Sequence, residues 1–316
     1  MKHRFFLFAF LPLAALFLAS CQPAKPCTPP AGTVAQDNLE PADWGKLYPV
    51  EYSLWQATRD PKPVHMSTYK KGWDTDLVIY DKLSEFPYMG ILFNGWGFGV
   101  EYNEPRGHHY MVSDQLEVDP SRIKAGGVCL TCKTTYATKL KNGMGEGYFM
   151  KPYGEVLAQI PDRHRKLGVM CNDCHNASTM GNRIERWTLK EAAAKVGRDT
   201  ATLTSQELRS AVCAQCHVTY VIPKDSRMHS TGVFFPWDGS KWGGISIENI
   251  IKTIRSSDSH REWKQKVTGL RLGFVRHPEF EFYSNNSVHW KADVACADCH
   301  MPYRRVGQYK VSDHDV

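Results

Sequence analysis

The chain has 316 residues, 42% of them hydrophobic, and a formal net charge of +6. This composition supports a packed globular core and excludes an intrinsically disordered chain. The basic residues form no clustered stripe along the sequence, so we expect no nucleic-acid partner.

The first twenty residues have the pattern of an export signal. Basic residues come first, and an apolar run over residues 5–19 follows. This run is shorter than the roughly 18 residues that span a membrane, and it fits the apolar region of a signal peptide. Cys21 comes directly after small residues, a pattern typical of lipoproteins. It predicts a lipidated Cys21 that anchors an exported domain on the periplasmic side of a membrane. Ordinary signal cleavage, with Cys21 incidental, is the alternative.

Residues 21–43 contain five prolines and few large apolar side chains. They are predicted to form an extended, Pro-rich tether. Cys27 lies within this tether, and the sequence gives it no role. Residues 44–316 have a globular, aromatic-rich composition and are predicted to form one domain.

Three segments of this domain carry signals for helix starts. Residues 188–191 and 204–207 both read Thr-x-x-Glu, the pattern of a capping box. Ser246 precedes a segment whose isoleucines share one helical face: Ile247, Ile250, Ile251 and Ile254. Long alternating runs typical of strands are absent from the sequence. We therefore predict a mainly α, loop-rich fold with little β structure.

Eight of the ten cysteines form four C-x-x-C pairs. In three pairs a His follows the second Cys, at residues 171–175, 213–217 and 296–300. This is the attachment motif of c-type haem, in which both thiols bond to the porphyrin and the His binds the iron. Zinc sites and disulfides also use C-x-x-C pairs. Neither explains why the His recurs, so we predict haem c at Cys171, Cys174, Cys213, Cys216, Cys296 and Cys299.

The fourth pair, Cys129 and Cys132, is followed by Lys133. Beside three haem motifs, it predicts a fourth haem with a Lys amine as its proximal ligand. An amine binds a metal only when it is deprotonated, and the metal itself favours that state. An enzyme can use such a ligand and leave the opposite face of the iron for substrate. The alternative is that Lys133 is a surface residue and a remote His binds this iron.

A C-x-x-C-K motif upstream of C-x-x-C-H motifs resembles the pentahaem cytochrome c nitrite reductases, which form ammonium. Further segments resemble signatures of that family and occur in its order: residues 102–108 (YNEPRGH), 213–220 (CAQCHVTY), 235–238 (FPWD), 277–281 (HPEFE), 296–302 (CADCHMP) and 312–314 (SDH). The resemblance extends from about residue 95 to the end of the chain. It implies a multihaem cytochrome c fold and the six-electron reduction of nitrite.

The resemblance also implies a ligand for each iron. Proximal ligands would be Lys133 for the catalytic haem and His175, His217 and His300 for three electron-transfer haems. Distal ligands would be His108 for the Cys213/Cys216 haem, His314 for the Cys171/Cys174 haem and His289 for a fifth haem.

Three further residues would form the substrate pocket. Tyr220 and His277 match the family's pocket Tyr and His. Arg122 is the candidate for the pocket Arg, with Arg106 as the alternative. A cationic Arg and a His favour an anionic substrate, and His and Tyr can relay protons.

Two other functions fit the haem motifs without the family match. One is a multihaem electron carrier that performs no catalysis, and the other is a related enzyme acting on hydroxylamine or a sulfur oxyanion. For the nitrite reductase, the resemblance implies a periplasmic or membrane-anchored electron donor, either a quinol dehydrogenase or a cytochrome. It also implies a homodimer for the full-length protein.

The sequence departs from the family at a calcium site beside the catalytic haem. The family's Glu, Lys and Gln at this site correspond to Thr219, Phe274 and Arg276. Calcium prefers several oxygen ligands, and these changes remove a carboxylate and an amide oxygen and add a cation. We therefore predict no calcium, with the Arg276 guanidinium in its place. The alternative is that Arg276 points to solvent.

The second departure is at the C-terminus. The chain ends two residues after His314, where the family continues with a fifth C-x-x-C-H motif and a helical dimer interface. We expect a fragment with four of five haem motifs. A true four-haem protein is the alternative.

Overall fold

The computed structural model describes residues 32–60, 79–120 and 126–316. The predicted signal sequence, Cys21, Cys27 and Arg122 lie outside the described residues. Short helices joined by irregular loops make up most of the described chain, which confirms the predicted mainly helical fold.

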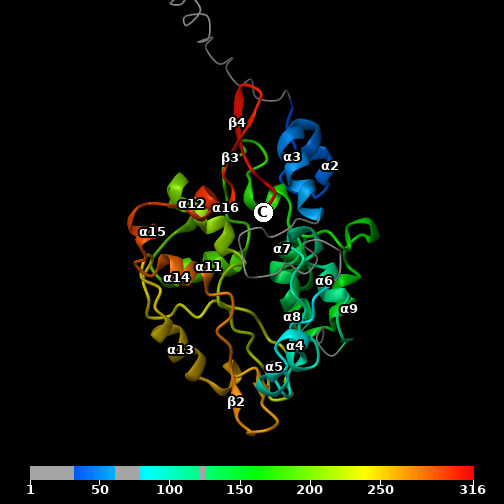
Figure 1. The fold of residues 1–316 in the computed structure, drawn as a ribbon, viewed down its shortest axis with the longest axis vertical. Helices are drawn as coiled ribbons and strands as arrows, with labels where there is room; N and C mark the ends of the chain where they lie inside the picture. The colour runs from blue at the N-terminus through cyan, green and yellow to red at the C-terminus, as the bar shows by residue number, and fades with distance from the viewer. Residues whose placement is uncertain (1–31, 61–78, 121–125) are drawn as a thin grey trace, which may run out of the picture.

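The helices are distributed over the whole described chain (Figure 1). The first half contains α2 (Pro41–Leu47), α3 (Pro49–Gln56), α4 (Lys82–Glu85), α5 (Tyr88–Leu92), α6 (Ser113–Leu116), α7 (Ala137–Met144), α8 (Gly147–Met150) and α9 (Tyr153–Leu157). The second half contains α10 (Cys171–Cys174), α11 (Trp187–Lys195), α12 (Ser205–Ala214), α13 (Ile247–Arg255), α14 (Glu279–Ser284), α15 (Val288–Lys291) and α16 (Cys296–His300). Short 3-10 helices are η1 (Ala57–Arg59), η2 (Gly97–Gly99), η3 (His108–Tyr110), η5 (Gly126–Cys132), η6 (Asp162–His164), η7 (Thr200–Thr202) and η8 (Asp258–His260).

The strands of the described residues form two small antiparallel pairs. Strand β1 (Trp263–Lys264) pairs with β2 (Arg271–Leu272), and β3 (Tyr303–Val306) pairs with β4 (Tyr309–Ser312). The tight turn of the second hairpin contains Gly307 at φ +60°, a conformation that glycine adopts without a steric penalty. These strands are too short for an alternating pattern to reveal them.

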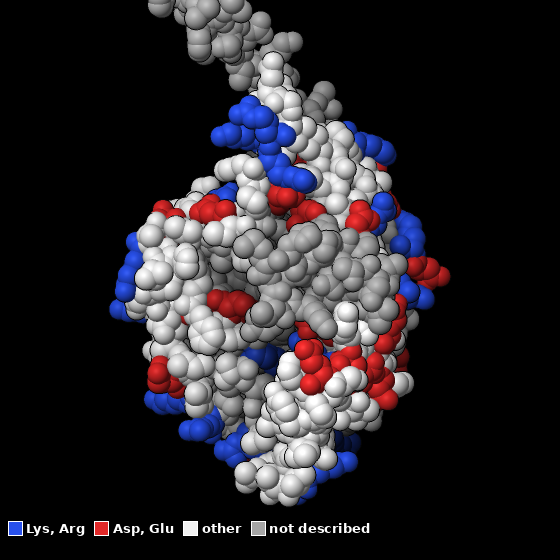
Figure 2. All heavy atoms as spheres, in the orientation of Figure 1, with Lys and Arg blue, Asp and Glu red and all other residues white. Residues whose placement is uncertain are grey.

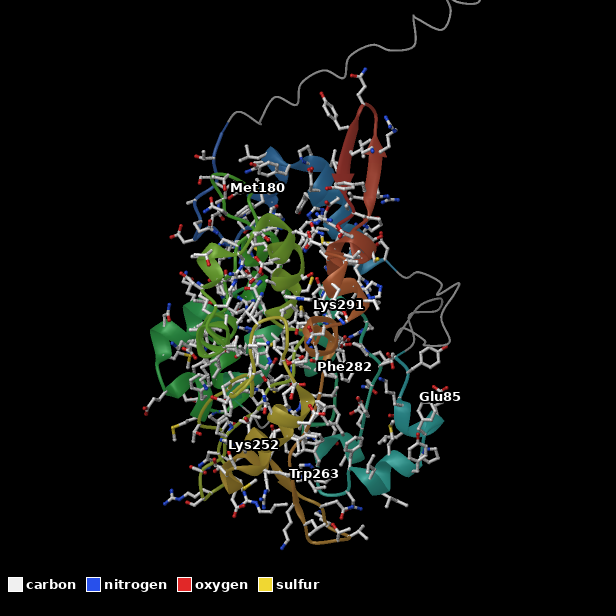
Figure 3. All side chains as sticks on the ribbon, turned by 90° about the vertical axis from the view of Figure 1, so that its left-hand side faces the viewer. Glu85, Met180, Lys252, Trp263, Phe282 and Lys291 are labelled. Atoms are coloured by element: carbon white, nitrogen blue, oxygen red, sulfur yellow. The ribbon has the colours of Figure 1, made fainter. Side chains whose placement is uncertain are left out.

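The described chain is elongated, with the two hairpins near opposite ends (Figure 1). Helices α2 and α3 lie beside the β3–β4 hairpin in both ribbon views (Figures 1 and 3). Met180 lies toward this end and Trp263 toward the other (Figure 3). The last residues return from the hairpin toward the body of the molecule, which brings the C-terminal segment back to the second cysteine motif.

Two of the predicted helix starts are confirmed. Thr204 accepts a hydrogen bond from the Glu207 amide in a reciprocal capping box, and α12 then extends into the third motif. Ser246 accepts from the Asn249 amide at the start of α13. The predicted start at Thr188 is wrong, since α11 begins one residue earlier and Arg186 is its N-cap.

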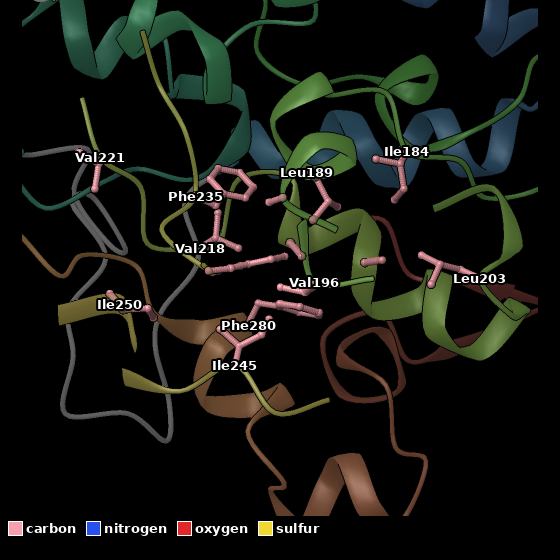
Figure 4. Close-up of a cluster of buried hydrophobic side chains, with 14 of the residues drawn as sticks. Ile184, Leu189, Val196, Leu203, Val218, Val221, Phe235, Ile245, Ile250 and Phe280 are labelled. Atoms are coloured by element: carbon pink, nitrogen blue, oxygen red, sulfur yellow. The ribbon is translucent and has the colours of Figure 1, made fainter. Parts of the chain in front are cut away.

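The largest core cluster joins α11, α12, α13 and α14 (Figure 4). Trp237 belongs to this cluster, is fully buried and stacks on Phe280, with ring centroids 5.8 Å apart. Ile250 and Ile254 complete the apolar face predicted for α13. Burial of such side chains stabilises the fold by about 1.5–3 kcal/mol each, so this cluster fixes α12, which carries Cys213.

The predicted end of the Pro-rich tether, at residue 43, lies too late in the sequence. Val34 is buried against Trp44 and Met170, well before the predicted boundary at residue 43. The Gln36 side chain accepts from the Ala177 amide and donates to the His175 carbonyl. The described residues 32–43 are therefore packed on the domain beside the second cysteine motif.

On the face shown in Figure 2, Lys and Arg side chains gather over the β3–β4 hairpin, where Arg304, Arg305 and Lys310 are exposed. Among the described residues, no helix combines the length and the apolar character that crossing a membrane requires.

Candidate functional site

The four C-x-x-C pairs lie on helical turns. They belong to η5, α10, the end of α12 and α16. Residues three apart on a helical turn share one face, so both thiols of each pair point to the same side. None of the eight cysteines in these motifs forms a disulfide, and seven of them are half-buried. Each motif thus offers two thiols and a following side chain to one planar group, as haem c attachment requires.

Side chains near α12 bring the motifs together. Gln215, inside the third motif, donates to the Asp173 carbonyl of the second motif at 3.0 Å. Its own carbonyl oxygen lies 3.9 Å from the Cys132 sulfur of the first motif. The Cys296 amide of the fourth motif donates to the Ser210 hydroxyl of α12 at 3.0 Å. Groups attached to these cysteines would be neighbours, which suits electron transfer between them.

His175 and His314 face each other, as the predicted ligand pair requires. Their ring centroids are 6.0 Å apart. A metal–imidazole bond is about 2 Å long, so two rings on opposite sides of one metal ion have centroids about 6 Å apart. The Nδ1 atoms lie 2.9 Å from the Met180 carbonyl and 2.8 Å from the Ser312 carbonyl, which leaves both Nε2 atoms for a metal. Burial lowers the pKa of His175 and favours the neutral, ligating imidazole.

The second predicted pair, His108 and His217, has the same spacing. Its ring centroids are 6.1 Å apart, although the residues belong to η3 and the third motif. The Glu279 carboxylate lies 4.0 Å from Nδ1 of His217. A carboxylate on this side orients an imidazole whose other nitrogen binds a metal. Both pairs therefore fit a six-coordinate haem iron.

The remaining predicted histidine ligands, His300 and His289, are exposed. His300 ends α16, and His289 lies in α15. Neither ring contacts a second imidazole among the described residues. Their roles stay predictions.

Lys133 directly follows η5 and is half-buried. Its amide donates to the Leu130 carbonyl at 3.0 Å and continues the helical turn that carries Cys129 and Cys132. Lys133 thus follows its cysteine pair as His175 follows the pair in α10. Its role as an iron ligand stays a prediction.

Tyr220 and His277 come together beside this first motif. Their rings stack with centroids 6.5 Å apart and an interplanar angle of 12°. Tyr220 also packs on the cluster that contains Val128, the residue before Cys129. Burial raises the pKa of Tyr220 to about 12, so the phenol keeps its proton at neutral pH. His277 has φ +52°, a strained conformation for a non-glycine residue of the kind that clusters at functional sites.

Glu279 links the pocket His to a predicted haem ligand. Its carboxylate lies 3.8 Å from Nδ1 of His277 as well as 4.0 Å from Nδ1 of His217. Although burial opposes it, contact with these two rings holds the pKa of Glu279 well below its usual range. Glu279 is therefore a carboxylate that lies within ion-pair distance of both rings. The HPEFE segment indicated its position but not these contacts.

Arg276 lies against the pocket, and the alternative that it points to solvent is wrong. Its side chain is only 14% exposed and forms an ion pair with Glu262, which is buried. The guanidinium lies 4.6 Å from the Tyr220 ring centroid and 4.4 Å from that of Phe274. No motif or spacing in the sequence pointed to Glu262.

Arg106, the alternative pocket Arg, is engaged elsewhere. It forms ion pairs of 2.5 Å with Asp114 and with Glu117 and lies over the Tyr110 ring. Two carboxylates already offset its charge, which makes it a poor receptor for an anion. Arg122 lies outside the described residues.

Comparisons with known proteins point to one family. The family model described as cytochrome c552 matches residues 40–316. A cytochrome c-552 from Desulfotalea psychrophila is 31% identical over 298 residues, which cover 90% of this chain and 53% of that protein. A cytochrome c-552 from Bacteroides fragilis is 31% identical over 281 residues, covering 86% and 52%. The chain thus spans about half the length of these curated relatives.

A solved structure with a similar fold is cytochrome c nitrite reductase from Desulfovibrio desulfuricans, described as having two calcium sites in its catalytic subunit. It superposes with a TM-score of 0.74 at 25% identity, covering 89% of this chain and 62% of that one.

Proposed function

We propose, since this chain belongs to the cytochrome c552 family, that it reduces nitrite to ammonium at a haem c bound by Cys129 and Cys132. One observation carries the proposal. Tyr220 and His277 stack beside the motif in which Lys133 takes the place of the usual His. An electron carrier needs no pair of proton-donating side chains beside one of its haems, whereas reduction of nitrite requires protons at that position.

Haem c, when bound, supplies an iron that accepts electrons singly and can bind an anion. Lys133 would hold the iron at the first motif, and the haem there would supply the site at which nitrite is reduced. His175 with His314 and His217 with His108 would ligate the second and third irons, a role that their 6.0 and 6.1 Å centroid separations support. His300 would ligate the fourth, and His289 would serve a fifth haem outside these four motifs.

The pocket side chains divide the remaining work. Conversion of nitrite to ammonium and two waters consumes six electrons and eight protons. Tyr220 stays protonated at neutral pH and can donate a hydrogen bond and a proton to a substrate oxygen. His277, beside the Glu279 carboxylate, can pass on further protons. The Arg276 guanidinium adds positive charge beside Tyr220 and favours an anionic substrate.

We infer that the chain works without calcium at this pocket. The buried Arg276–Glu262 pair supports this inference for two reasons. The Arg276 guanidinium beside Tyr220 repels a divalent cation. It also pairs with the Glu262 carboxylate, so no metal is needed to offset that negative charge. Metal analysis of the purified haem-loaded protein is expected to find no calcium, and chelation is expected to leave nitrite reduction unchanged. One calcium per Lys133-ligated haem would refute the inference.

Steady-state assays with a reduced viologen donor, measuring ammonium from nitrite, test the main proposal. Substituting Tyr220→Phe or His277→Ala is expected to slow the reaction by about 10²–10⁴-fold, the usual contribution of a positioned acid or base. Matched controls are Tyr283→Phe in α14 and His260→Ala in η8, both half-buried and away from the first motif. Equal losses in the controls, or no loss in the pocket variants, would contradict these roles.

Spectroscopy separates the enzyme from the electron carrier. Electron paramagnetic resonance of the oxidised protein is expected to show one high-spin, ligand-accessible haem among low-spin haems. Exclusively low-spin haems would favour the carrier. Rapid turnover of hydroxylamine or sulfite without turnover of nitrite would favour a related enzyme instead.

We also infer an exported protein held at the periplasmic side of a membrane through lipidated Cys21. Its electron donor would be a periplasmic or membrane-anchored protein. Support comes from the signal-like residues 1–20 and the small residues before Cys21. Expression with a radiolabelled fatty acid is expected to label the parent protein but not Cys21→Ser. Equal labelling of both would contradict the lipid anchor.

A further inference from the structure

Arg186 connects three of the four cysteine motifs. It is 1% exposed and caps the start of α11. Its amide donates to the Gln215 side chain of the third motif at 2.8 Å. Its guanidinium donates to the Thr134 carbonyl, next to Lys133, at 2.8 Å. The same Nη2 lies 2.7 Å from the Asp173 carboxylate of the second motif. One buried cation therefore occupies the junction of these motifs.

The protein only partly satisfies this guanidinium. Nε and Nη1 of Arg186 are buried without a hydrogen-bond partner. The Asp173 Oδ1 atom lies within ion-pair distance of Nη2 but makes no aligned hydrogen bond. Burial of an incompletely paired charge costs several kcal/mol, and an apolar side chain of similar size would often be more stable. Stability alone does not account for a charged residue at this position, which points to an electrostatic role.

The ion pair has a definite direction relative to the cysteines. The Arg186 guanidinium donates to the Thr134 carbonyl, two residues after Cys132 of the first motif. Asp173 lies inside the second motif, between Cys171 and Cys174 on α10. The positive end of the pair therefore lies at the first motif, and the negative end lies within the second.

We propose that the Arg186–Asp173 pair raises the reduction potential of the haem on the first motif relative to the haem on the second. This inference rests on the proposed attachment of haem c to these motifs. Adding an electron to a haem adds negative charge, which a nearby cation favours and a nearby anion opposes. Electrons move toward higher potential, so the pair directs them from the Cys171/Cys174 haem toward the haem ligated by Lys133. Arg186 and Asp173 thus influence electron delivery through the reduction potentials of the haems.

Redox titration of the purified haem-loaded protein, followed by optical and electron paramagnetic resonance spectra, tests the proposal. The high-spin signal isolates the Lys133-ligated haem from the low-spin haems. Arg186→Met is expected to shift the high-spin component to lower potential. Arg186→Lys, which keeps the charge, is expected to stay close to the parent. Asp173→Asn removes the negative charge but keeps an oxygen that can accept the hydrogen bond from the Met170 amide. It is expected to shift one low-spin component, that of the haem on the second motif, to higher potential.

The matched control is Arg198→Met. Arg198 forms a similar ion pair with Glu207 at the start of α12, but no contact of this pair involves a cysteine motif. It is expected to leave all potentials unchanged. If Arg186→Met does not retain its haems, Asp173→Asn and Arg186→Lys still decide the question. Unchanged potentials in Asp173→Asn, or a shift in Arg186→Lys as large as in Arg186→Met, would overturn the proposal. A parent protein without a high-spin haem would instead contradict the proposed nitrite reduction.

Discussion

Glu281 is a buried carboxyl whose titration should be visible in the stability of the protein. It lies in α14 and is 2% exposed. One oxygen accepts from the Trp237 indole at 2.8 Å and from the Thr219 amide at 2.9 Å. The other oxygen is buried without a partner. Burial raises the pKa of Glu281 from its usual 4.5 to about 7. Replacement by Gln keeps the accepting oxygen and removes the titration.

The raised pKa fixes the sign of the effect. Between pH 4.5 and 7 the folded protein binds more protons at Glu281 than the unfolded chain does, so its free energy of unfolding falls as the pH rises. The loss continues through pH 7 and is nearly complete by about pH 8. From pH 5 to pH 8 a shift of this size corresponds to about 2.5 kcal/mol. When the pH is raised from 5 to 8, the free energy of unfolding of Glu281→Gln should therefore increase by about 2.5 kcal/mol relative to that of the parent.

Chemical denaturation followed by far-ultraviolet circular dichroism, at pH 5 and at pH 8, measures this difference. Glu191→Gln, an exposed position on α11, is the control and should show no such gain. Comparing the parent with each variant at the same pH cancels all other titrating groups. A difference between parent and Glu281→Gln that stays constant over this range would refute the reasoning.

Three further predictions concern stability and are checked by the same denaturation assay. Glu262→Gln leaves the buried Arg276 charge unpaired and should cost about 3–5 kcal/mol; a cost below about 1 kcal/mol would mean that solvent already screens this pair. Ile250→Ala removes a fully buried side chain from the largest core and should cost about 2–5 kcal/mol, whereas the same change at exposed Val267 should cost little. Ser246→Ala removes the N-cap of α13 and should cost about 1 kcal/mol; a Ser246→Asp variant as unstable as Ser246→Ala would contradict the capping role.

Local chemistry made much of this protein predictable from its sequence. Attachment of haem c needs two thiols and an axial ligand at fixed spacing, so each motif is complete within five consecutive residues. The capping box at Thr204 and the cap at Ser246 also form between residues three apart. Such features depend on the backbone of a single turn, and the structure reproduces them.

Features that depend on distant residues were predictable only through the family resemblance. His175 and His314 are separated by much of the chain, yet their rings lie 6.0 Å apart. Nothing in the spacing of these residues indicates that pairing, because loop lengths do not fix where a chain returns. The signature at residues 312–314 supplied it, and the one at residues 102–108 supplied the pairing of His108 with His217.

Tertiary structure alone decided the rest. Thr188 does not cap its helix, because the Gln215 side chain binds the Arg186 and Glu185 amides and fixes the start of α11. Glu262 became the partner of Arg276 only when the β1–β2 region folded against the pocket. By itself, the sequence determined which residues can hold haem and which turns can form, since those are contacts between near neighbours. Which buried charges meet, and which way their fields point, depended on packing between segments far apart in the chain.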